Sequence, residues 1–149
     1  MKVRLYTPND LEDLIAIIKA HLHADVVLHI GPWNRSEAML REAIPSCAKN
    51  IEVMERSGEI VAFVWAQVYK EHMQLEEIHV VTSARGQGLG QALLKRVEKT
   101  ALAHGVDEVR LAVFQSSDAV GFYRAFGFEV RQEREHHQFL MAKKLNRRP

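Results

Sequence analysis

The sequence predicts a single α/β domain over residues 1–149, in which a mixed β-sheet of six to seven strands is flanked by about four helices. Three observations predict this class. Runs of strand-like apolar residues are interleaved with runs of helical periodicity. Some neighbouring strand-like runs are joined by tight-turn signals, whereas others are joined across a helix. A glycine-rich loop links one strand directly to the helix that follows it.

The chain begins with a short strand over Val3–Tyr6 and then a capped helix. Thr7 is expected to cap this helix, with Pro8 in its first turn and Asp10 at capping-box spacing. The residues that follow form one apolar face with helical spacing, namely Leu11, Leu14, Ile15, Ile18 and Leu22. Residues 24–50 carry a weaker pattern, which predicts a short helix over Glu37–Ile44 that ends before Pro45.

Three strands come next. Ile51–Glu55 and Glu59–Tyr69 are separated by a hairpin-turn signal at residues 56–59, and both faces of the second run are apolar. That run is therefore expected to be a central strand that is covered on both sides. A third strand, Met73–Val81, leads to the glycine-rich loop.

The loop and its helix predict a phosphate site. Gly86, Gly88 and Gly90 alternate, and glycine allows both a positive φ and the close approach of a ligand. The helix that follows has an apolar face of Leu89, Leu93, Val97 and Ala101, and Gly105 is expected to end it. The first turn of a helix presents unpaired N–H groups at the positive end of its dipole, where a phosphate binds well.

The last third of the chain reads as a strand, a helix and a hairpin. Val109–Phe114 is the strand, and Asp118–Phe126 is the helix. Phe128–Arg134 and Gln138–Leu145 form the hairpin.

The net charge, the hydropathy and the cysteine count of the chain exclude several classes of protein. The net charge of +1 gives no global field for nucleic acid or an anionic membrane, and no apolar run approaches the length of a membrane span. Cys47 is the single cysteine, so an intrachain disulfide is impossible. These features favour a cytoplasmic protein.

The spacing of the glycines limits which class of phosphate ligand the loop can bind. A dinucleotide fingerprint would place its third glycine at position 91 or 93, which are Gln91 and Leu93, and no Gly-Lys-Ser/Thr follows for a Walker loop. The pattern that is present, Arg85-x-x-Gly88-x-Gly90, resembles the pyrophosphate-binding loop of the GNAT superfamily of N-acetyltransferases. Ala119-Val-Gly-Phe-Tyr-Arg-Ala-Phe-Gly-Phe128 is similar to the second signature of that family.

The resemblance covers Leu75–Phe128, and the flanks match only in element order. It implies the GNAT acyl-CoA N-acyltransferase fold with a mostly antiparallel sheet, in which the strands at 73–81 and 109–114 splay apart around the pantetheine of acetyl-CoA. It implies acetyl-CoA as co-substrate and no metal. The pyrophosphate would lie on the backbone of Arg85, Gly86, Gln87, Gly88, Leu89 and Gly90. Pantetheine would pair with the backbone of Ile78, His79 and Val80. Ser116 stands where many members have a cofactor-contacting Asn.

The same resemblance assigns the chemistry. Tyr123 would be the general acid that protonates the CoA thiolate, although a plain core tyrosine is the alternative reading. Three polar residues in the strand before the loop are candidates for the base: Glu76 by match to the family, then Glu77, then His79. Deprotonating an ammonium with a pKa of about 10.4 at pH 7 costs on the order of 5 kcal/mol, so a base is needed. A solvent-exposed polar pair is the competing interpretation of the two glutamates.

The expected reaction is direct attack of a primary amine on the thioester, because Cys47 lies outside both signatures. The expected acceptor is a small-molecule amine or the amine of a peptide or protein. No nucleic acid or membrane partner is expected. A homodimer is possible, because the final hairpin could pair its strands with those of a second copy. The alternative is a CoA-binding regulatory or scaffold module that does not catalyse. His21 and His23 on a helix, like the adjacent His136 and His137, would point their rings apart, so a metal site is not expected.

Overall fold

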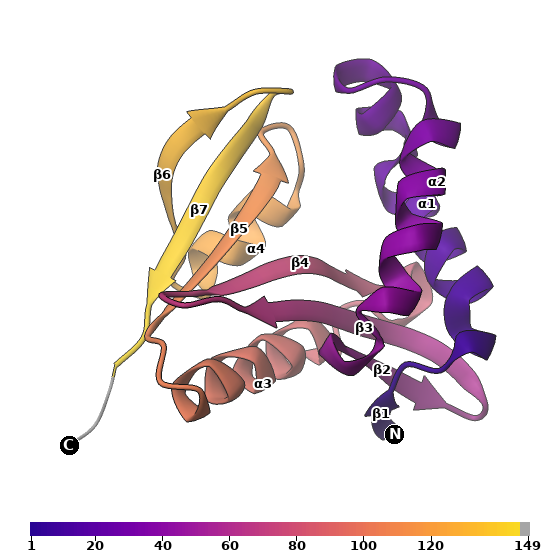
Figure 1. The fold of residues 1–149 in the computed structure, drawn as a ribbon, viewed down its shortest axis with the longest axis horizontal. Helices are drawn as coiled ribbons and strands as arrows, with labels where there is room; N and C mark the ends of the chain where they lie inside the picture. The colour runs from indigo at the N-terminus through magenta and orange to yellow at the C-terminus, as the bar shows by residue number, and fades with distance from the viewer. Residues whose placement is uncertain (147–149) are drawn as a thin grey trace. The chain divides into compact units, whose positions relative to one another are not determined.

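The computed structural model describes residues 1–146 (Figure 1). Its elements in chain order are β1 (Lys2–Leu5), η1 (Pro8–Asp10), α1 (Leu11–His29), α2 (Trp33–Ser46), η2 (Ala48–Asn50), β2 (Ile51–Arg56), β3 (Glu59–Val68), β4 (Met73–Val80), η3 (Thr82–Ala84), α3 (Leu89–Ala103), β5 (Glu108–Phe114), α4 (Ala119–Ala125), β6 (Glu129–Arg134) and β7 (Gln138–Lys144).

The strands join in the order β1-β2-β3-β4-β5-β7-β6. The β1–β2, β2–β3, β5–β7 and β6–β7 pairs are antiparallel, and the β4–β5 pair is parallel. The sheet is therefore mixed and mostly antiparallel, and four α-helices accompany it within residues 1–146. This confirms the predicted fold class.

Two compact units divide the chain. The first comprises Met1–Trp65 and Glu77–Gly90, and the second comprises Ala66–Glu76 and Gln91–Pro149. Strands β3 and β4 and helix α3 each contribute residues to both units. The extent of a single domain over residues 1–149 stays a prediction.

In the first unit, β3 is the best-buried strand. Residues 61–65 are all buried, which confirms the prediction of a strand covered on both faces. The β2–β3 turn places Ser57 and Gly58 at φ of 53° and 81°, the left-handed geometry that tight hairpins need. Helix α1 packs against α2 (Figure 1), and α1 buries Leu14, Ile15, Ile18 and Val26.

Both N-terminal helices are longer than predicted. Helix α1 continues beyond Leu22 to His29, and Val26 extends its buried face by one more i+4 step. Helix α2 starts at Trp33, directly after Pro32, and contains Pro45 in its last turn. The prediction that this helix ends before Pro45 is wrong. A proline next to a helix end removes only one hydrogen bond, and the last turn tolerates that loss.

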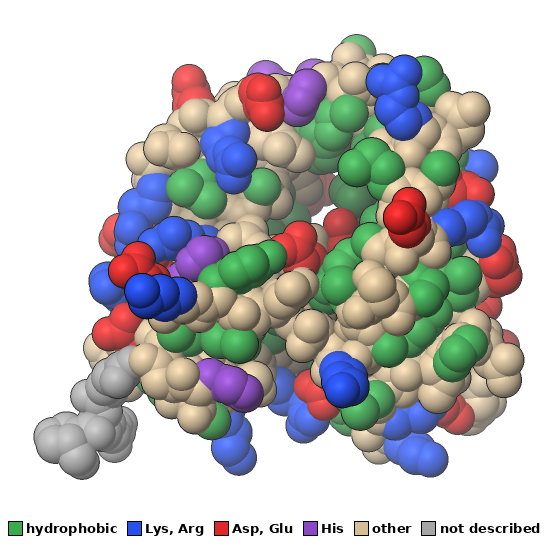
Figure 2. Space-filling model, in the orientation of Figure 1, with side chains coloured by type: hydrophobic (Ala, Val, Ile, Leu, Met, Phe, Trp, Pro, Cys, Tyr) green, Lys and Arg blue, Asp and Glu red, His purple; other side chains and the backbone are tan. Residues whose placement is uncertain are grey.

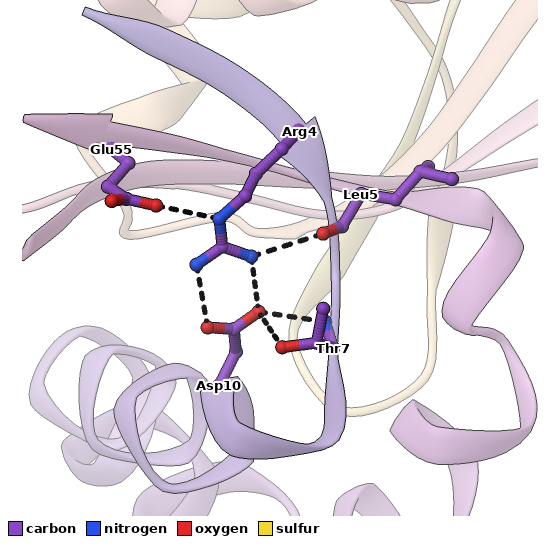
Figure 3. A network of polar contacts seen from close by, with 5 residues as sticks. All are labelled: Arg4, Leu5, Thr7, Asp10 and Glu55. Carbon is purple, nitrogen blue, oxygen red and sulfur yellow. Dashed lines mark hydrogen bonds and ion pairs between the residues drawn. The ribbon is translucent and has the colours of Figure 1, made fainter. Parts of the chain in front are cut away.

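A network around Arg4 fastens β1 to β2 and to the start of α1 (Figure 3). The Arg4 guanidinium donates to both oxygens of Asp10, at 2.8 and 2.9 Å, and its Nε donates to Glu55 at 2.7 Å. Asp10 also accepts the backbone N–H of Thr7 at 2.8 Å, which is the half of the predicted capping box that its carboxylate supplies. Hydrogen bonds from Arg4 lower the pKa of the buried Asp10 carboxyl. We call Arg4, Thr7, Asp10 and Glu55 the Arg4 network.

In the second unit, β5 pairs with β7 along its whole length, and β7 pairs with β6. Helix α3 buries Leu93, Leu94, Val97 and Ala101, and Gly105 follows it at φ 80°, as predicted for the residue after a helix end. The parallel register between β4 and β5 runs through Met73–Val109 and Gln74–Arg110, near the start of each strand. The splay predicted beyond that point stays a prediction.

Candidate functional site

The glycine loop lies in the first unit, between η3 and the start of α3. Gly86 and Gly88 adopt φ of 77° and 79°, a conformation that side chains strain, and a Cβ added at either would meet nothing within 4 Å. The loop is anchored upstream, where the Val81 N–H donates to Val61 at 2.9 Å. Within residues 1–146, no protein acceptor takes the backbone N–H groups of Gly86, Gln87 or Gly88. The loop therefore offers several backbone donors in an open setting.

Two side chains of the loop are held by residues from elsewhere in the first unit. Gln87 accepts a hydrogen bond of 2.5 Å from Arg56, at the end of β2. Arg85 donates through Nε to the Val80 carbonyl at 3.3 Å, and one of its terminal nitrogens lies 3.1 Å from Nε2 of His21. Arg85 is thereby connected to helix α1 as well as to β4.

A chain of side chains runs onward from Arg85. Nδ1 of His21 lies 2.8 Å from Nδ1 of His79, and Nε2 of His79 lies 2.6 Å from Oε1 of Glu77. His79 is 7% exposed, and the Phe63 ring lies against it with centroids 5.3 Å apart. Burial, together with the neighbouring His79 and Arg85, lowers the pKa of His21 to about 4, so His21 is neutral at pH 7. We call Glu77, His79, His21 and Arg85 the histidine chain.

The alternation of β4 separates the two candidate carboxylates. Glu77 and His79 lie two residues apart, so they share a face of the strand and can meet. Glu76 belongs to the opposite face and to the second unit, and it is exposed. Ile78 and Val80, predicted to pair with pantetheine through their backbone, are half-buried neighbours of His79.

Tyr123 and Ser116 lie in the second unit. Tyr123 is in α4, is 8% exposed, and makes edge-on contacts with the rings of Phe122 and Phe128, at 5.5 and 5.6 Å between centroids. Ser116 is exposed in the segment between β5 and α4. Its neighbour Ser117 accepts the Ala119 N–H at 3.1 Å and so supports the start of α4.

The structure thus brings Glu77, His79 and Arg85 together in one unit and adds two residues that sequence reasoning did not place there, His21 and Arg56. On sequence alone, His21 is a candidate only as a metal ligand, a role that its spacing from His23 does not favour. Among the described residues, no group of three or more His, Cys, Asp and Glu side chains could hold a metal ion. The helical spacing of His21 after Ile18, on the buried side of α1, was the one available signal that its ring points inward.

The surface carries both charges. Figure 2 shows Lys and Arg side chains interspersed with Asp and Glu over the face that it draws, in keeping with the net charge of +1. None of the helices in residues 1–146 is both long enough and apolar enough to cross a bilayer.

Comparison with known proteins gives a consistent result. The family model described as the acetyltransferase (GNAT) family matches residues 18–128, a span that contains His21, the glycine loop and Tyr123. An acetyltransferase of Yersinia enterocolitica is 28% identical over 131 residues, which are 87% of this chain and 89% of that protein.

Solved structures share the fold. PaiA N-acetyltransferase of Thermoplasma acidophilum, in complex with coenzyme A, superposes with a TM-score of 0.77 at 20% identity and covers 96% of this chain and 98% of its own. The ribosomal-protein-S18-alanine N-acetyltransferase of Escherichia coli gives a TM-score of 0.74 at 22% identity and covers 99% and 96%. At these identities the likeness is one of fold.

Proposed function

Because the chain belongs to the acetyltransferase (GNAT) family, we propose that it transfers the acetyl group of acetyl-CoA to a primary amine by direct attack of the amine on the thioester. The observation that carries this proposal is the glycine loop, in which the N–H groups of Gly86, Gln87 and Gly88 have no protein acceptor within the described residues. The proposed catalytic power comes mainly from holding amine and thioester together.

The cofactor is proposed to bind through the backbone. The diphosphate would take N–H groups within residues 85–90, of which the Arg85 N–H already donates to the Thr82 carbonyl at 3.3 Å. Pantetheine would pair with residues 78–80. A single helix-end contact contributes only about 0.3–1 kcal/mol at an exposed site, so affinity requires several of these contacts together. The relative bound to coenzyme A supports the choice of ligand. Ser116 would add one hydroxyl contact.

Tyr123 is the proposed general acid, which returns a proton to the departing CoA thiolate. A phenol with a pKa near ~10 and a thiol near ~8.5 make this transfer slightly uphill but feasible in a positioned pair. The family signature at residues 119–128 supports the assignment.

We propose Glu77 as the base ahead of Glu76, which the resemblance ranks first; Glu76 and His79 are the alternatives, and a water is a further link. The support for Glu77 is geometric: one oxygen is engaged by His79, and the side chain retains 19% exposure, so the carboxylate is both held and reachable. A carboxylate also attracts the ammonium form of an amine before it takes the proton. The proposed acceptor is a small-molecule amine or the amine of a peptide or protein. The proposal also includes a homodimer.

The test begins with binding. Acetyl-CoA should raise the melting temperature, and NAD should not. Gly88→Val should abolish that shift, whereas Gly105→Val, which imposes the same strain at φ 80° outside the loop, should lower the melting temperature and keep the shift. Equal loss of binding in both variants would contradict the assignment of the loop.

Catalysis is then measured by thiol release over a panel of polyamines, amino acids, aminoglycosides and peptides. Tyr123→Phe should lower kcat by about 10²–10⁴-fold with the affinity for acetyl-CoA nearly intact. An unchanged kcat would remove Tyr123 from the mechanism. Binding of acetyl-CoA with no turnover of any amine would favour a module that binds CoA without catalysis.

A further inference from the structure

We propose that His21 is a positioning residue: with His79 it forms a one-way hydrogen-bond chain that runs from Arg85 to Glu77 and fixes the Glu77 carboxylate for its role as base. The role as base rests on the proposed function. The direction of the chain rests on the contacts alone.

The two ends decide the direction. A guanidinium has only donors, so Nε2 of His21, which faces Arg85 at 3.1 Å, must be the acceptor. An ionised carboxylate has only acceptors, so Nε2 of His79, which faces Glu77 at 2.6 Å, must carry the hydrogen.

The middle link follows from the ends. Neutral His21 accepts at Nε2, so its hydrogen is on Nδ1. That hydrogen faces Nδ1 of His79 and needs an acceptor there, so His79 carries its hydrogen on Nε2 alone. The 2.8 Å contact between the two Nδ1 atoms is then a single N–H···N bond donated by His21. Each of the three contacts has one donor and one acceptor, and all the donors point toward Glu77.

Protonating either ring would break this arrangement. A hydrogen on Nε2 of His21 would face the Arg85 donor, and a hydrogen on Nδ1 of His79 would face the hydrogen of His21. The groups facing the two rings are Glu77 from β4, Arg85 from the loop and the Phe63 ring from β3. The lowered pKa of His21 agrees with a ring that is held neutral.

The consequence for Glu77 is a defined orientation. Oε1 is engaged by His79, which leaves Oε2 for a substrate proton. A side chain with three rotatable bonds would otherwise distribute that oxygen over several positions. His21 therefore acts on Glu77 through His79. Its hydrogen bond sets the tautomer of the His79 ring, and that ring holds the Glu77 carboxylate.

The direct experiment is long-range ¹H–¹⁵N NMR of the histidine rings in the full chain without cofactor at pH 7. We expect His21 protonated at Nδ1 and His79 protonated at Nε2. In Arg85→Leu, Nδ1 of His79 still presents an acceptor to His21, so we expect His21 to keep its hydrogen on Nδ1 and to lose only the contact at Nε2. A wild-type His21 carrying its hydrogen on Nε2, or a cationic ring at either position, would overturn the proposal.

Kinetic variants test the positioning role. His21→Leu should lower kcat by about 10–100-fold, a part of the ~10²–10⁴ that acid–base catalysis supplies, with KM for acetyl-CoA unchanged. His21→Asn should recover most of the rate, because its amide nitrogen is as many bonds from Cα as Nδ1 and can still donate to His79. His23→Leu, at an exposed site on the same helix, is the control and should keep the wild-type rate.

Wild-type kcat and pH profile in His21→Leu would also overturn the proposal, provided that circular dichroism shows a folded variant. A wild-type protein that transfers acetyl to no amine would instead defeat the proposed function, and the NMR result would still decide the direction of the chain.

Discussion

The Arg4 network and the histidine chain both bury polar side chains in the first unit, but they satisfy them by different means. Asp10 is 5% exposed and is paired with a permanent cation through two hydrogen bonds. His79 is 7% exposed and is paired with a ring that can carry its hydrogen on either nitrogen. Nearly equal burial thus accompanies two different kinds of chemistry.

The difference between the Arg4 network and the histidine chain shows which buried polar groups indicate a functional site. A buried carboxylate that is clamped by a guanidinium gains stability from fixed charges, and neither oxygen is left for a ligand. A buried imidazole held by neighbours of matching polarity keeps protons that can be moved. Burial of a polar group is therefore a weak indicator of function, and the exchangeability of its protons is a stronger one.

The largest expected effect is a loss of kcat on substitution in the histidine chain, which the Arg4 network should not show. Glu77→Gln should lower kcat by about 10²–10⁴-fold, because an amide cannot take a proton from the amine. Unfolding in urea should change little, since the half-buried Gln can turn its carbonyl oxygen to His79. Glu76→Gln is the matched control. A larger rate loss in Glu76→Gln would transfer the role of base to Glu76.

The next effect separates the two regions by stability. Asp10→Asn replaces an acceptor of the Arg4 guanidinium with an amide donor and should cost about 2–3 kcal/mol in the free energy of unfolding. The rate constant kcat of the folded variant should stay at the wild-type value. Asp13→Asn, at an exposed position on α1, should cost less than about 1 kcal/mol. A rate loss in Asp10→Asn matching that of Glu77→Gln would remove the distinction between the regions.

Acid should affect the two regions in sequence. The pKa of His21 is lowered from 6.5 to about 4, so the unfolded chain binds the proton more readily and stability falls as the pH drops from 6.5 to 4. The pKa of Asp10 is lowered from 3.8, so its contribution persists to lower pH and is lost below that value. Urea midpoints measured from pH 7 to pH 3 should show the upper step and the onset of the lower one, and His21→Leu should flatten the upper one. An unchanged upper step in that variant would assign the loss to other groups.

The smallest expected effect lies at the rim of the Arg4 network. Glu55→Gln breaks an ion pair in which both side chains are 26% exposed, and it should cost no more than about 1 kcal/mol. Urea denaturation of this variant beside Asp10→Asn tests whether burial or charge sets the scale. Equal losses in the two variants would show that charge alone decides.

Local patterns were sufficient for the fold class and for most elements. The apolar face of α1, the continuous apolar run of β3 and the glycines at 58, 86, 88 and 105 each act within a few residues, where periodicity and backbone geometry are decisive. The extents of α1 and α2 were underestimated, because tertiary packing of the two helices extends them through residues with a weak pattern of their own.

The candidate site was less accessible to sequence reasoning. The contact between His21 and His79 joins residues 58 apart in sequence, and the contact between Arg56 and Gln87 joins residues 31 apart. No local pattern encodes such pairs. Alternation along β4 places Glu76 and Glu77 on opposite faces of the strand. Only the neighbours of that strand distinguish the two carboxylates.

Two imidazoles, each with two neutral forms, have four ways to place their hydrogens, and the end groups of the histidine chain admit one of them. A diphosphate that drew Arg85 away would free Nε2 of His21 as an acceptor, whereas His79 would still hold the hydrogen of His21 on Nδ1. Occupancy of the loop would therefore be felt at one nitrogen of His21, and the hydrogen bond that orients Glu77 would persist.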